Sequence, residues 1–377
     1  MKIKSLRLTN FRNYHSLELD LNPGINIFIG ENGVGKTNIL ESIYVLALTK
    51  TNRDNLDNEM IKFNEEFLRI EGKIIREDLI KTKEIYLTKN KKQLFVNGKE
   101  VRKHRDYVKD FCVISFSPRD LDIISGSPSI RRNMINIDLS EINNNYISYL
   151  NEYNTVVKMR NEYLKKMNLD GYKDERYLDI MNNELIKKTI KIYEYRLKFI
   201  DKINQIIPNI FKKITGLEGL KIKYNSTIGV DNYNEEEIIK KMNSKFKKNM
   251  NFELMQGATT IGPHRDDLSF LLNELDMKGF ASEGQQRMAV IALKIAEIYI
   301  FKEELKEYPV LLLDDIFSEL DIKKRNKIIK FLDDNIQTII TTTDINDINE
   351  DIIEKAIIYN VKKGKVTKKG RIKNGRK

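Results

Sequence analysis

A glycine-rich segment at residues 30–37, with the sequence GENGVGKT, limits the possible folds of this chain more than any other feature. Its G-x-x-x-x-G-K-T spacing is that of a phosphate-binding loop (P-loop), in which glycines let backbone N–H groups converge on phosphate oxygens. The apolar run 25–29 predicts a strand before the loop, and apolar spacing over 36–47 predicts a helix after it. Strand, loop and helix in this order favour a nucleotide site over a chance glycine turn.

The residues of this loop have distinct expected roles. Lys36 brings positive charge to the β- and γ-phosphates and is a predicted catalytic residue, and the Thr37 hydroxyl is a predicted Mg²⁺ ligand. The positive end of the following helix adds to the attraction for phosphate. The predicted nucleotide-binding residues of the loop are Gly30, Glu31, Asn32, Gly33, Val34, Gly35, Lys36 and Thr37.

A second segment, Leu-Leu-Leu-Asp-Asp at 311–315, has the pattern of a Walker B strand. An apolar strand that ends in a carboxylate places it beside the Mg²⁺ of a P-loop site, and Asp314 is the predicted metal ligand. A second acid can orient or deprotonate the attacking water, so Asp315 is the candidate catalytic carboxylate. Many buried strands end in Asp; the combination with the P-loop makes this pattern informative.

The segment 281–287, Ala-Ser-Glu-Gly-Gln-Gln-Arg, precedes the Walker B strand by about thirty residues. Taken alone, Ser followed by Glu and Gln is ordinary helix-start chemistry. At this position it resembles the S-x-G-Q signature of ABC-type ATPases. Ser-Glu-Leu-Asp at 318–321 and Thr-Thr-Thr-Asp at 341–344 follow in the order of that family's D-loop and switch segments.

Further stretches narrow the resemblance to the RecF family, in the SMC-like branch of ABC ATPases. They are LTNFRNY at 8–14, the P-loop, FSPRDL at 116–121, GSPSIRR at 126–132, GPHRDDL at 262–268, EGQQR at 283–287, and residues 312–321. The chain departs from the family pattern at two positions. Arg119 stands where the family usually has an acid, and Glu283 replaces a more common Gln or Gly.

This resemblance implies an α/β fold: an ABC-type P-loop ATPase head, with a mixed sheet and flanking helices, plus a mainly helical inserted domain. It implies that Ser282, Gly284 and Gln285 bind the γ-phosphate held by an opposite subunit. Thr343 takes the place of the switch histidine, and Arg12 lies near the phosphates, although a surface arginine in a loop is the alternative.

The family also implies a function. We expect ATP and Mg²⁺ as cofactors, an ATP-driven homodimer that binds duplex and gapped DNA at single/double-strand junctions, and a weak DNA-dependent ATPase activity for release. The implied partners are RecO and RecR, which together with it load RecA, and the implied location is the cytoplasm, at the nucleoid. Alternatives are an ATP-gated scaffold without direct DNA contact and an ATPase subunit of an ABC transporter.

Changes in sequence pattern predict the domains: 1–125 with 251–361 as the ATPase domain, 126–250 as the helical insertion, and 362–377 as a disordered basic tail. The chain carries a net charge of +11, of which nine positive charges lie in that tail. Residues 131–250 hold 23 Lys and Arg against 16 Asp and Glu. The densest cluster is the candidate DNA contact, with an ordinary solvated face as the alternative: Lys240, Lys241, Lys245, Lys247 and Lys248.

Other residue types exclude some site classes. One cysteine, Cys112, excludes an internal disulfide and a multi-cysteine zinc site, and three scattered histidines disfavour a metal cluster. No apolar run approaches the roughly 20 residues of a membrane helix. His264 and Arg265 are either a structural brace or a phosphate contact, and the tyrosines of the insertion are expected mainly to pack rather than to stack on bases.

Overall fold

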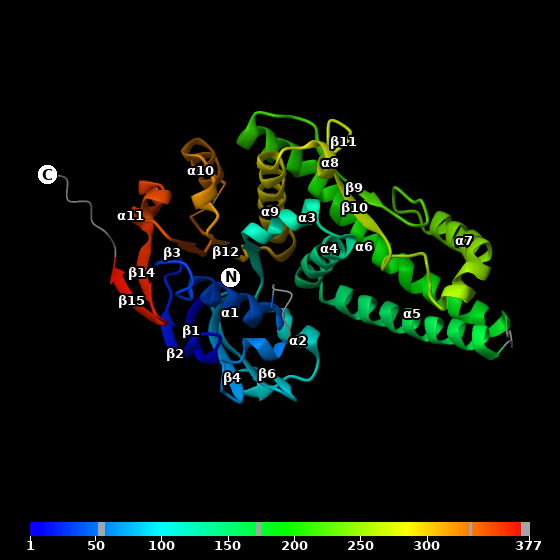
Figure 1. Ribbon diagram of the computed structural model, residues 1–377, viewed down its shortest axis with the longest axis horizontal. Helices are drawn as coiled ribbons and strands as arrows, with labels where there is room; N and C mark the ends of the chain where they lie inside the picture. The colour runs from blue at the N-terminus through cyan, green and yellow to red at the C-terminus, as the bar shows by residue number, and fades with distance from the viewer. Residues whose placement is uncertain (52–56, 171–174, 332–333, 371–377) are drawn as a thin grey trace. The chain divides into compact units, whose positions relative to one another are not determined.

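The computed structural model describes residues 1–51, 57–170, 175–331 and 334–370 (Figure 1). It divides into two compact units. The head comprises Met1–Asp120, Lys213–Thr215 and Ile291–Lys377, and the inserted unit comprises Leu121–Lys212 and Gly216–Val290. The last head segment begins at residue 291, whereas the sequence pattern predicted a return to the ATPase domain at 251. The reason is that β10 (Asp267–Leu272) pairs with β9 (Leu220–Asn225) inside the inserted unit.

A largely parallel sheet forms one layer of the head, with the order β15-β14-β3-β13-β12-β8. Its five parallel strands are β14 (Ile357–Lys362), β3 (Ile25–Ile29), β13 (Thr338–Thr342), β12 (Val310–Asp314) and β8 (Val113–Phe116). They are short and mostly buried, as strands covered on both faces are. The expected mixed sheet is confirmed, because β15 adds an antiparallel edge.

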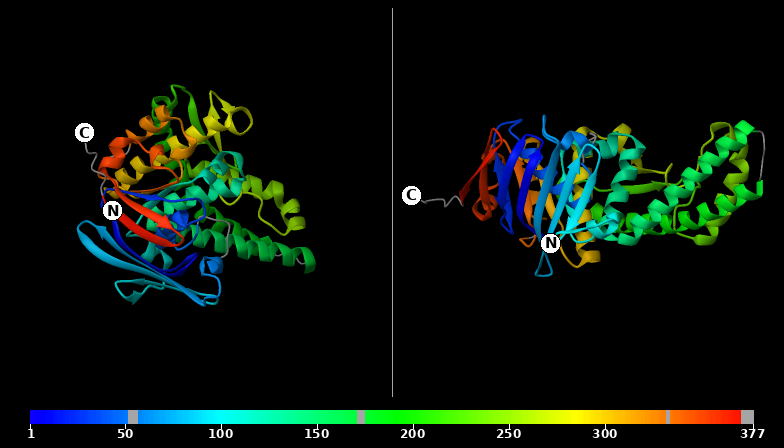
Figure 2. Two further views of the ribbon diagram at one scale, coloured as in Figure 1. Left: turned by 60° about the vertical axis from the view of Figure 1, so that its left-hand side comes forward. Right: turned by 90° about the horizontal axis from the view of Figure 1, so that it is seen from below.

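An antiparallel sheet of order β2-β1-β4-β5-β6-β7 forms a second layer of the head (Figure 2). Its strands are β1 (Lys2–Phe11), β2 (Tyr14–Asp20), β4 (Phe67–Arg76), β5 (Leu79–Thr88), β6 (Lys92–Val96) and β7 (Lys99–Glu100). Helix α1 (Lys36–Leu48) contacts strands of both sheets. A Cβ on Gly72 would lie 2.3 Å from the Leu46 side chain, so glycine is what lets α1 approach β4.

The expectation of a disordered tail from residue 362 is wrong for its described part. Residues Lys365–Gly370 form β15, which pairs with β14. Lys363 and Gly364 both have positive φ, 45° and 73°, as a two-residue hairpin turn of the I′ kind requires. Backbone pairing and the cross-strand pair Val361–Val366 stabilise the hairpin, although its side chains are mostly lysine. Residues 371–377 lie outside the described residues.

The inserted unit is mainly helical, as expected. Its main helices are α4 (Pro128–Ile142), α5 (Asn144–Asp170), α6 (Glu175–Thr215, of which Lys213–Thr215 are counted with the head) and α7 (Glu235–Gln256). The small sheet β11-β10-β9, completed by β11 (Leu275–Asp276), was not predicted. None of the helices in the described part of the chain is long and apolar enough to cross a membrane.

Buried charged and aromatic side chains hold the inserted unit together. Arg160 and Glu253 form an ion pair at 2.7 Å, and both side chains are 0% exposed. Breaking such a pair by removing one partner costs about 3–5 kcal/mol, because the other charge is left buried. Tyr146 and Tyr153 are buried as well, which confirms the packing role expected for these two tyrosines.

Candidate nucleotide-binding site

The predicted phosphate and metal residues of the head meet at the carboxyl edge of the parallel sheet. Strand β3 ends at Ile29, which pairs with Thr342, and Asp314 at the end of β12 pairs with Thr341. The P-loop follows β3 directly and leads into α1. Parallel strands expose their loops at one edge, and this edge is where ligands bind in open α/β sheets.

The backbone of the P-loop needs its glycines. Gly33 and Gly35 have φ of 79° and 111°, values that residues other than glycine rarely adopt. A Cβ on Gly30 would lie 2.4 Å from the Val361 carbonyl oxygen. Asn13 Nδ2 donates to the Val34 carbonyl at 3.0 Å, and the Tyr14 hydroxyl donates to that of Gly35 at 3.1 Å. Both hydrogen bonds come from the stretch 8–14, which precedes the P-loop in the sequence. The sequence pattern did not predict that this stretch contacts the loop.

Lys36 is directed into the loop. Its Nζ donates to the carbonyl oxygens of Gly30 at 2.6 Å and Glu31 at 2.8 Å. Burial lowers the pKa of Lys36, and the charges of Asp315 and Asp314 oppose that shift. The ammonium is therefore held among carbonyls and two carboxylates, in the position from which a P-loop lysine reaches phosphate.

Thr37 and Asp314 meet as the predicted metal ligands. The Thr37 hydroxyl donates to Asp314 Oδ1 at 2.9 Å, and the Thr341 hydroxyl donates to the same oxygen at 2.7 Å. Mg²⁺ prefers oxygen ligands and is usually held by one or two protein groups, with water and phosphate completing its shell. One hydroxyl and one carboxylate fit that requirement. In the described residues, no cluster of three or more His, Cys, Asp or Glu side chains offers another metal site.

Asp315 has an unusual backbone and an unsatisfied carboxylate. Its φ is 51°, its N–H donates to the Thr341 carbonyl and hydroxyl, and its carbonyl accepts from the Ser318 hydroxyl at 2.8 Å. Its Oδ1 is buried and has no hydrogen-bond partner among the described residues. Burial raises the pKa of Asp315, while Ser318 and Lys36 lower it. Such an orphaned oxygen beside a phosphate-binding loop suits a group that acts on a bound ligand.

Arg12 is not a free surface arginine. Its guanidinium bonds to both carboxylate oxygens of Glu41 on α1, at 2.6 and 3.1 Å, and to the Glu59 carbonyl at 2.8 Å. The Arg12 side chain is 12% exposed and that of Glu41 is 1% exposed. Thr343 lies exposed directly after β13. The nucleotide roles of Arg12 and Thr343 stay predictions.

The signature segment belongs to the inserted unit, at the start of α9 (Glu283–Leu305). The Ser282 N–H donates to Gln285 Oε1 at 2.9 Å, and the Gln285 N–H donates to the Ser282 hydroxyl at 3.3 Å. This reciprocal pair is a capping box, so the helix-start interpretation holds locally. Both residues and Gly284 are exposed or partly exposed, and a Cβ on Gly284 would meet open space. Contact of this segment with a nucleotide stays a prediction.

Fold and site together define an ABC-type P-loop ATPase head of the SMC kind. An SMC head, solved bound to the C-winged helix domain of ScpA, has a similar fold, with a TM-score of 0.53 and 14% identity over 98% of each chain. The family model described as RecF/RecN/SMC N terminal domain matches residues 2–367. The chain belongs to the RecF family of DNA replication and repair proteins.

Individual relatives agree over their whole length. The DNA replication and repair protein RecF of Lactobacillus gasseri is 37% identical over 372 residues, which cover 98% of this chain and 100% of the relative. RecF of Staphylococcus carnosus is 36% identical over 370 residues, with the same coverage. The solved recombination mediator protein RecF-ATP of the RecFOR pathway has a TM-score of 0.90 and 32% identity over 97% of each chain.

Proposed function

We propose that this chain is an ATP-dependent DNA-binding protein of DNA replication and recombinational repair, which dimerises when it binds ATP. The observation that carries the proposal is the meeting of Lys36, Thr37 and Asp314 at the carboxyl edge of the parallel sheet. A relative with 32% identity has been solved as RecF-ATP, which supports ATP as the nucleotide.

The nucleotide would lie against the P-loop, with its β- and γ-phosphates at the loop N–H groups and Lys36. Thr37 and Asp314 would hold Mg²⁺, which supplies charge neutralisation to the phosphates when bound. Thr341 would fix the Asp314 carboxylate through its hydroxyl. Arg12 would act through Glu41 and α1, the helix that begins with Lys36.

Hydrolysis would depend on Asp315, with Lys36 stabilising the transferred phosphoryl group. The buried, unpartnered Oδ1 of Asp315 can accept a proton from an attacking water, and its raised pKa favours that role. We infer a slow ATPase activity that depends on DNA and works as a timer for release, because a head of this class binds ATP to change its assembly.

ATP would control assembly because the site is built from two copies. Ser282, Gly284 and Gln285 of one copy would cover the γ-phosphate in the P-loop of the other, using a small hydroxyl, a bare backbone and a helix start. Their exposure in this chain supports that use. Removal of the γ-phosphate would take away the group that both copies share.

DNA would contact the inserted unit. The five lysines of the predicted cluster lie on α7 within about 160° of arc at 100° per residue, opposite buried Met242 and Phe246. Lys241 is paired with Glu237, so four of the five have no ion pair among the described residues. Such a face suits duplex DNA and the duplex flanks of a gap.

RecO and RecR are the proposed protein partners, and RecA loading the proposed outcome, because similar proteins act in the RecFOR pathway. The corresponding location is the cytoplasm, at the nucleoid. The competing function is an ATP-gated scaffold whose partners supply all DNA contact.

Analytical ultracentrifugation of the wild type and Lys36→Ala tests the proposal, with and without Mg-ATP and a gapped duplex. We expect a monomer without ATP, a dimer with ATP, and a dimer–DNA complex only when both ligands are present. Lys36→Ala should stay monomeric throughout. An ATP-driven dimer that never carries DNA would favour the scaffold.

A further inference from the structure

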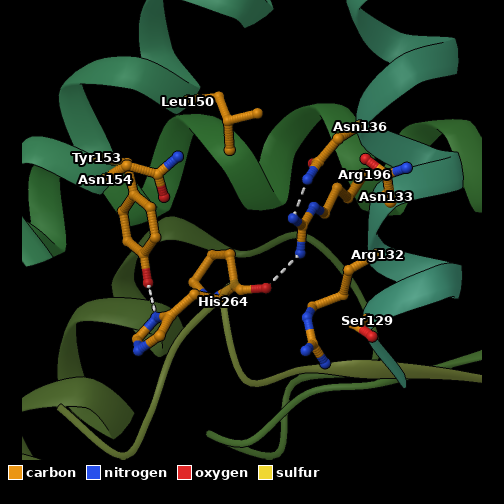
Figure 3. A pocket seen from close by; sticks show the side chains of 10 residues that line it. Ser129, Arg132, Asn133, Asn136, Leu150, Tyr153, Asn154, Arg196 and His264 are labelled. Atoms are coloured by element: carbon orange, nitrogen blue, oxygen red, sulfur yellow. Dashed lines mark hydrogen bonds between the residues drawn. The ribbon is translucent and has the colours of Figure 1, made fainter. Parts of the chain in front are cut away.

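A polar cavity of about 250 Å³ lies within the inserted unit, apart from the P-loop (Figure 3). Four of its lining residues follow one face of α4 at helical spacing: Ser129, Arg132, Asn133 and Asn136. The others come from α5, from α6 and from the loop before β10, and include Tyr153, Arg196 and His264. Two stretches of unassigned role, 126–132 and 262–268, thus meet in one cavity.

Arg196 supplies a fixed positive charge to the wall of this cavity. It is 1% exposed, and its guanidinium donates to the hydroxyls of Tyr146 and Tyr224, to the Pro263 carbonyl and to Asn136 Oδ1. None of these acceptors carries a full charge. The Tyr224 hydroxyl in turn donates to the buried carboxylate of Asp266 at 2.8 Å.

Arg132 is the second arginine of the cavity, and its charge is not neutralised by an ion pair within the described part of the chain. It donates to the Asp266 backbone carbonyl at 2.8 Å, which leaves most of its N–H groups for another acceptor. Burial lowers the pKa of Arg132, the negative charges of Asp267 and Asp266 raise it, and the positive charges of Arg196 and Arg265 lower it. An anion in the cavity would give the buried guanidinium of Arg132 a direct acceptor and would offset the positive charge of Arg196.

Tyr153 and His264 form an uncharged wall opposite the arginines. The Tyr153 hydroxyl and His264 Nδ1 are 2.5 Å apart, and His264 Nε2 lies 3.2 Å from the Thr259 carbonyl. A carbonyl oxygen can only accept a hydrogen bond, so Nε2 carries the proton and Nδ1 accepts from Tyr153. Burial lowers the pKa of His264 to about 4 and keeps the ring neutral. Selectivity for an anion therefore comes from the arginines.

We propose that this cavity binds a phosphate group of bound DNA, with Arg132 as its direct contact. Its volume lies below the roughly 300–1,000 Å³ of pockets for drug-sized ligands, so it fits one group of a larger molecule. A guanidinium fork matches phosphate oxygens, and the amides of exposed Asn133 and Asn154 add neutral donors at the rim. The inference rests on the proposed DNA-binding function and adds a contact away from the lysines of α7.

Salt-dependent DNA binding tests the contact. Arg132→Gln should weaken gapped-duplex binding by about tenfold or more, and reduce the slope of log K against log salt by about 0.9, the amount expected for one lost phosphate contact. Ser129→Asp keeps Arg132 but adds a carboxylate at the rim, and should do the same. The control Lys187→Gln removes one charge from an exposed pair on α6 and should leave the slope unchanged. Unfolding curves confirm that each variant folds.

Inorganic phosphate distinguishes a DNA phosphate from a free one. Phosphorus NMR line broadening is measured on Lys36→Ala, which weakens the P-loop, and on Lys36→Ala with Arg132→Gln. Loss of broadening with the second change, together with the altered DNA slope, supports the proposal. Loss of broadening with an unchanged DNA slope would mean a free-phosphate site and overturn the assignment to DNA; no change in either overturns the site. A wild type that binds no DNA at any salt instead removes the proposed function, and the phosphate measurement then judges the cavity alone.

Discussion

The Thr37 hydroxyl donates a hydrogen bond to Asp314 Oδ1 at 2.9 Å, across 277 residues of sequence. The bond joins the start of α1 to the end of β12 and so ties the P-loop to the Walker B strand. Thr341 bonds to the same oxygen from the neighbouring strand. Helix α1 and strand β13 therefore both bond to one carboxylate oxygen at the end of β12.

Thr341→Val should weaken Mg²⁺ affinity in the presence of ATP by roughly 10–100-fold, as loss of a group that orients a metal ligand usually does. Valine keeps the shape and removes the hydroxyl that fixes Asp314 and accepts from the Asp315 N–H. Mg²⁺ titration of bound fluorescent ATP measures the effect. Thr338→Val, on the same strand but with its hydroxyl near the Ile336 carbonyl, is the control. Equal Mg²⁺ affinity in both variants would remove Thr341 from this role.

Asp315→Asn should keep ATP binding and slow hydrolysis by about 10²–10⁴-fold, the usual contribution of a general base. The amide preserves the shape of the side chain but cannot take the proton of an attacking water. Single-turnover hydrolysis and ATP titration separate the two effects. A normal single-turnover rate would mean that another group is the base.

Ser282→Arg should leave ATP affinity unchanged and abolish ATP-dependent dimerisation. The Ser282 side chain is exposed at the start of α9, so an arginine is accommodated there but brings bulk and charge to the surface that would meet the second copy. Light scattering with Mg-ATP reports the dimer. Ser16→Arg places the same change on an exposed position of β2 and should dimerise normally. A dimer of Ser282→Arg would exclude the two-copy site.

Protonation of His264 should lower the stability of the inserted unit as the pH falls into the mildly acidic range. Its pKa is about 4 in the folded chain, below the ordinary value of 6.5, so the unfolded chain binds the proton first as the pH falls. The stabilisation is complete above about pH 6.5 and is lost as the pH falls through about 4, a loss of about 3 kcal/mol. Denaturant unfolding from pH 7.5 to 4 should show it in the wild type and in His15→Gln, which alters an exposed histidine. His264→Gln should lack this component; parallel curves for all three proteins would contradict it.

The head could be predicted well from sequence because its signals are local. The apolar run 25–29 is strand β3, and the Walker B segment 311–315 is strand β12 to within a residue at each end. The P-loop spacing predicted the loop that joins β3 to helix α1. The prediction of a disordered end from residue 362 was wrong because it was based on the many lysines. The Lys363-Gly364 turn and the pairing of β15 with β14 order this segment.

The inserted unit was harder to predict because its site depends on long-range contacts. Strand β9 is a short alternating segment that becomes recognisable only by its pairing with β10, 42 or more residues later. Arg132 and His264 share a cavity although no spacing relates them. The ion pair between Arg12 and Glu41 could not be predicted from the sequence either, because an arginine in a loop does not indicate which acid it contacts.

Equilibrium binding of the purified chain to single-stranded, duplex and gapped DNA, with and without Mg-ATP across a salt series, tests the central claim most directly. We expect tight, salt-sensitive binding to duplex and gapped DNA that requires ATP. The Lys36→Ala variant should lack this binding. Binding equally strong without ATP, or no binding to any of the three DNAs, would contradict an ATP-dependent DNA-binding function.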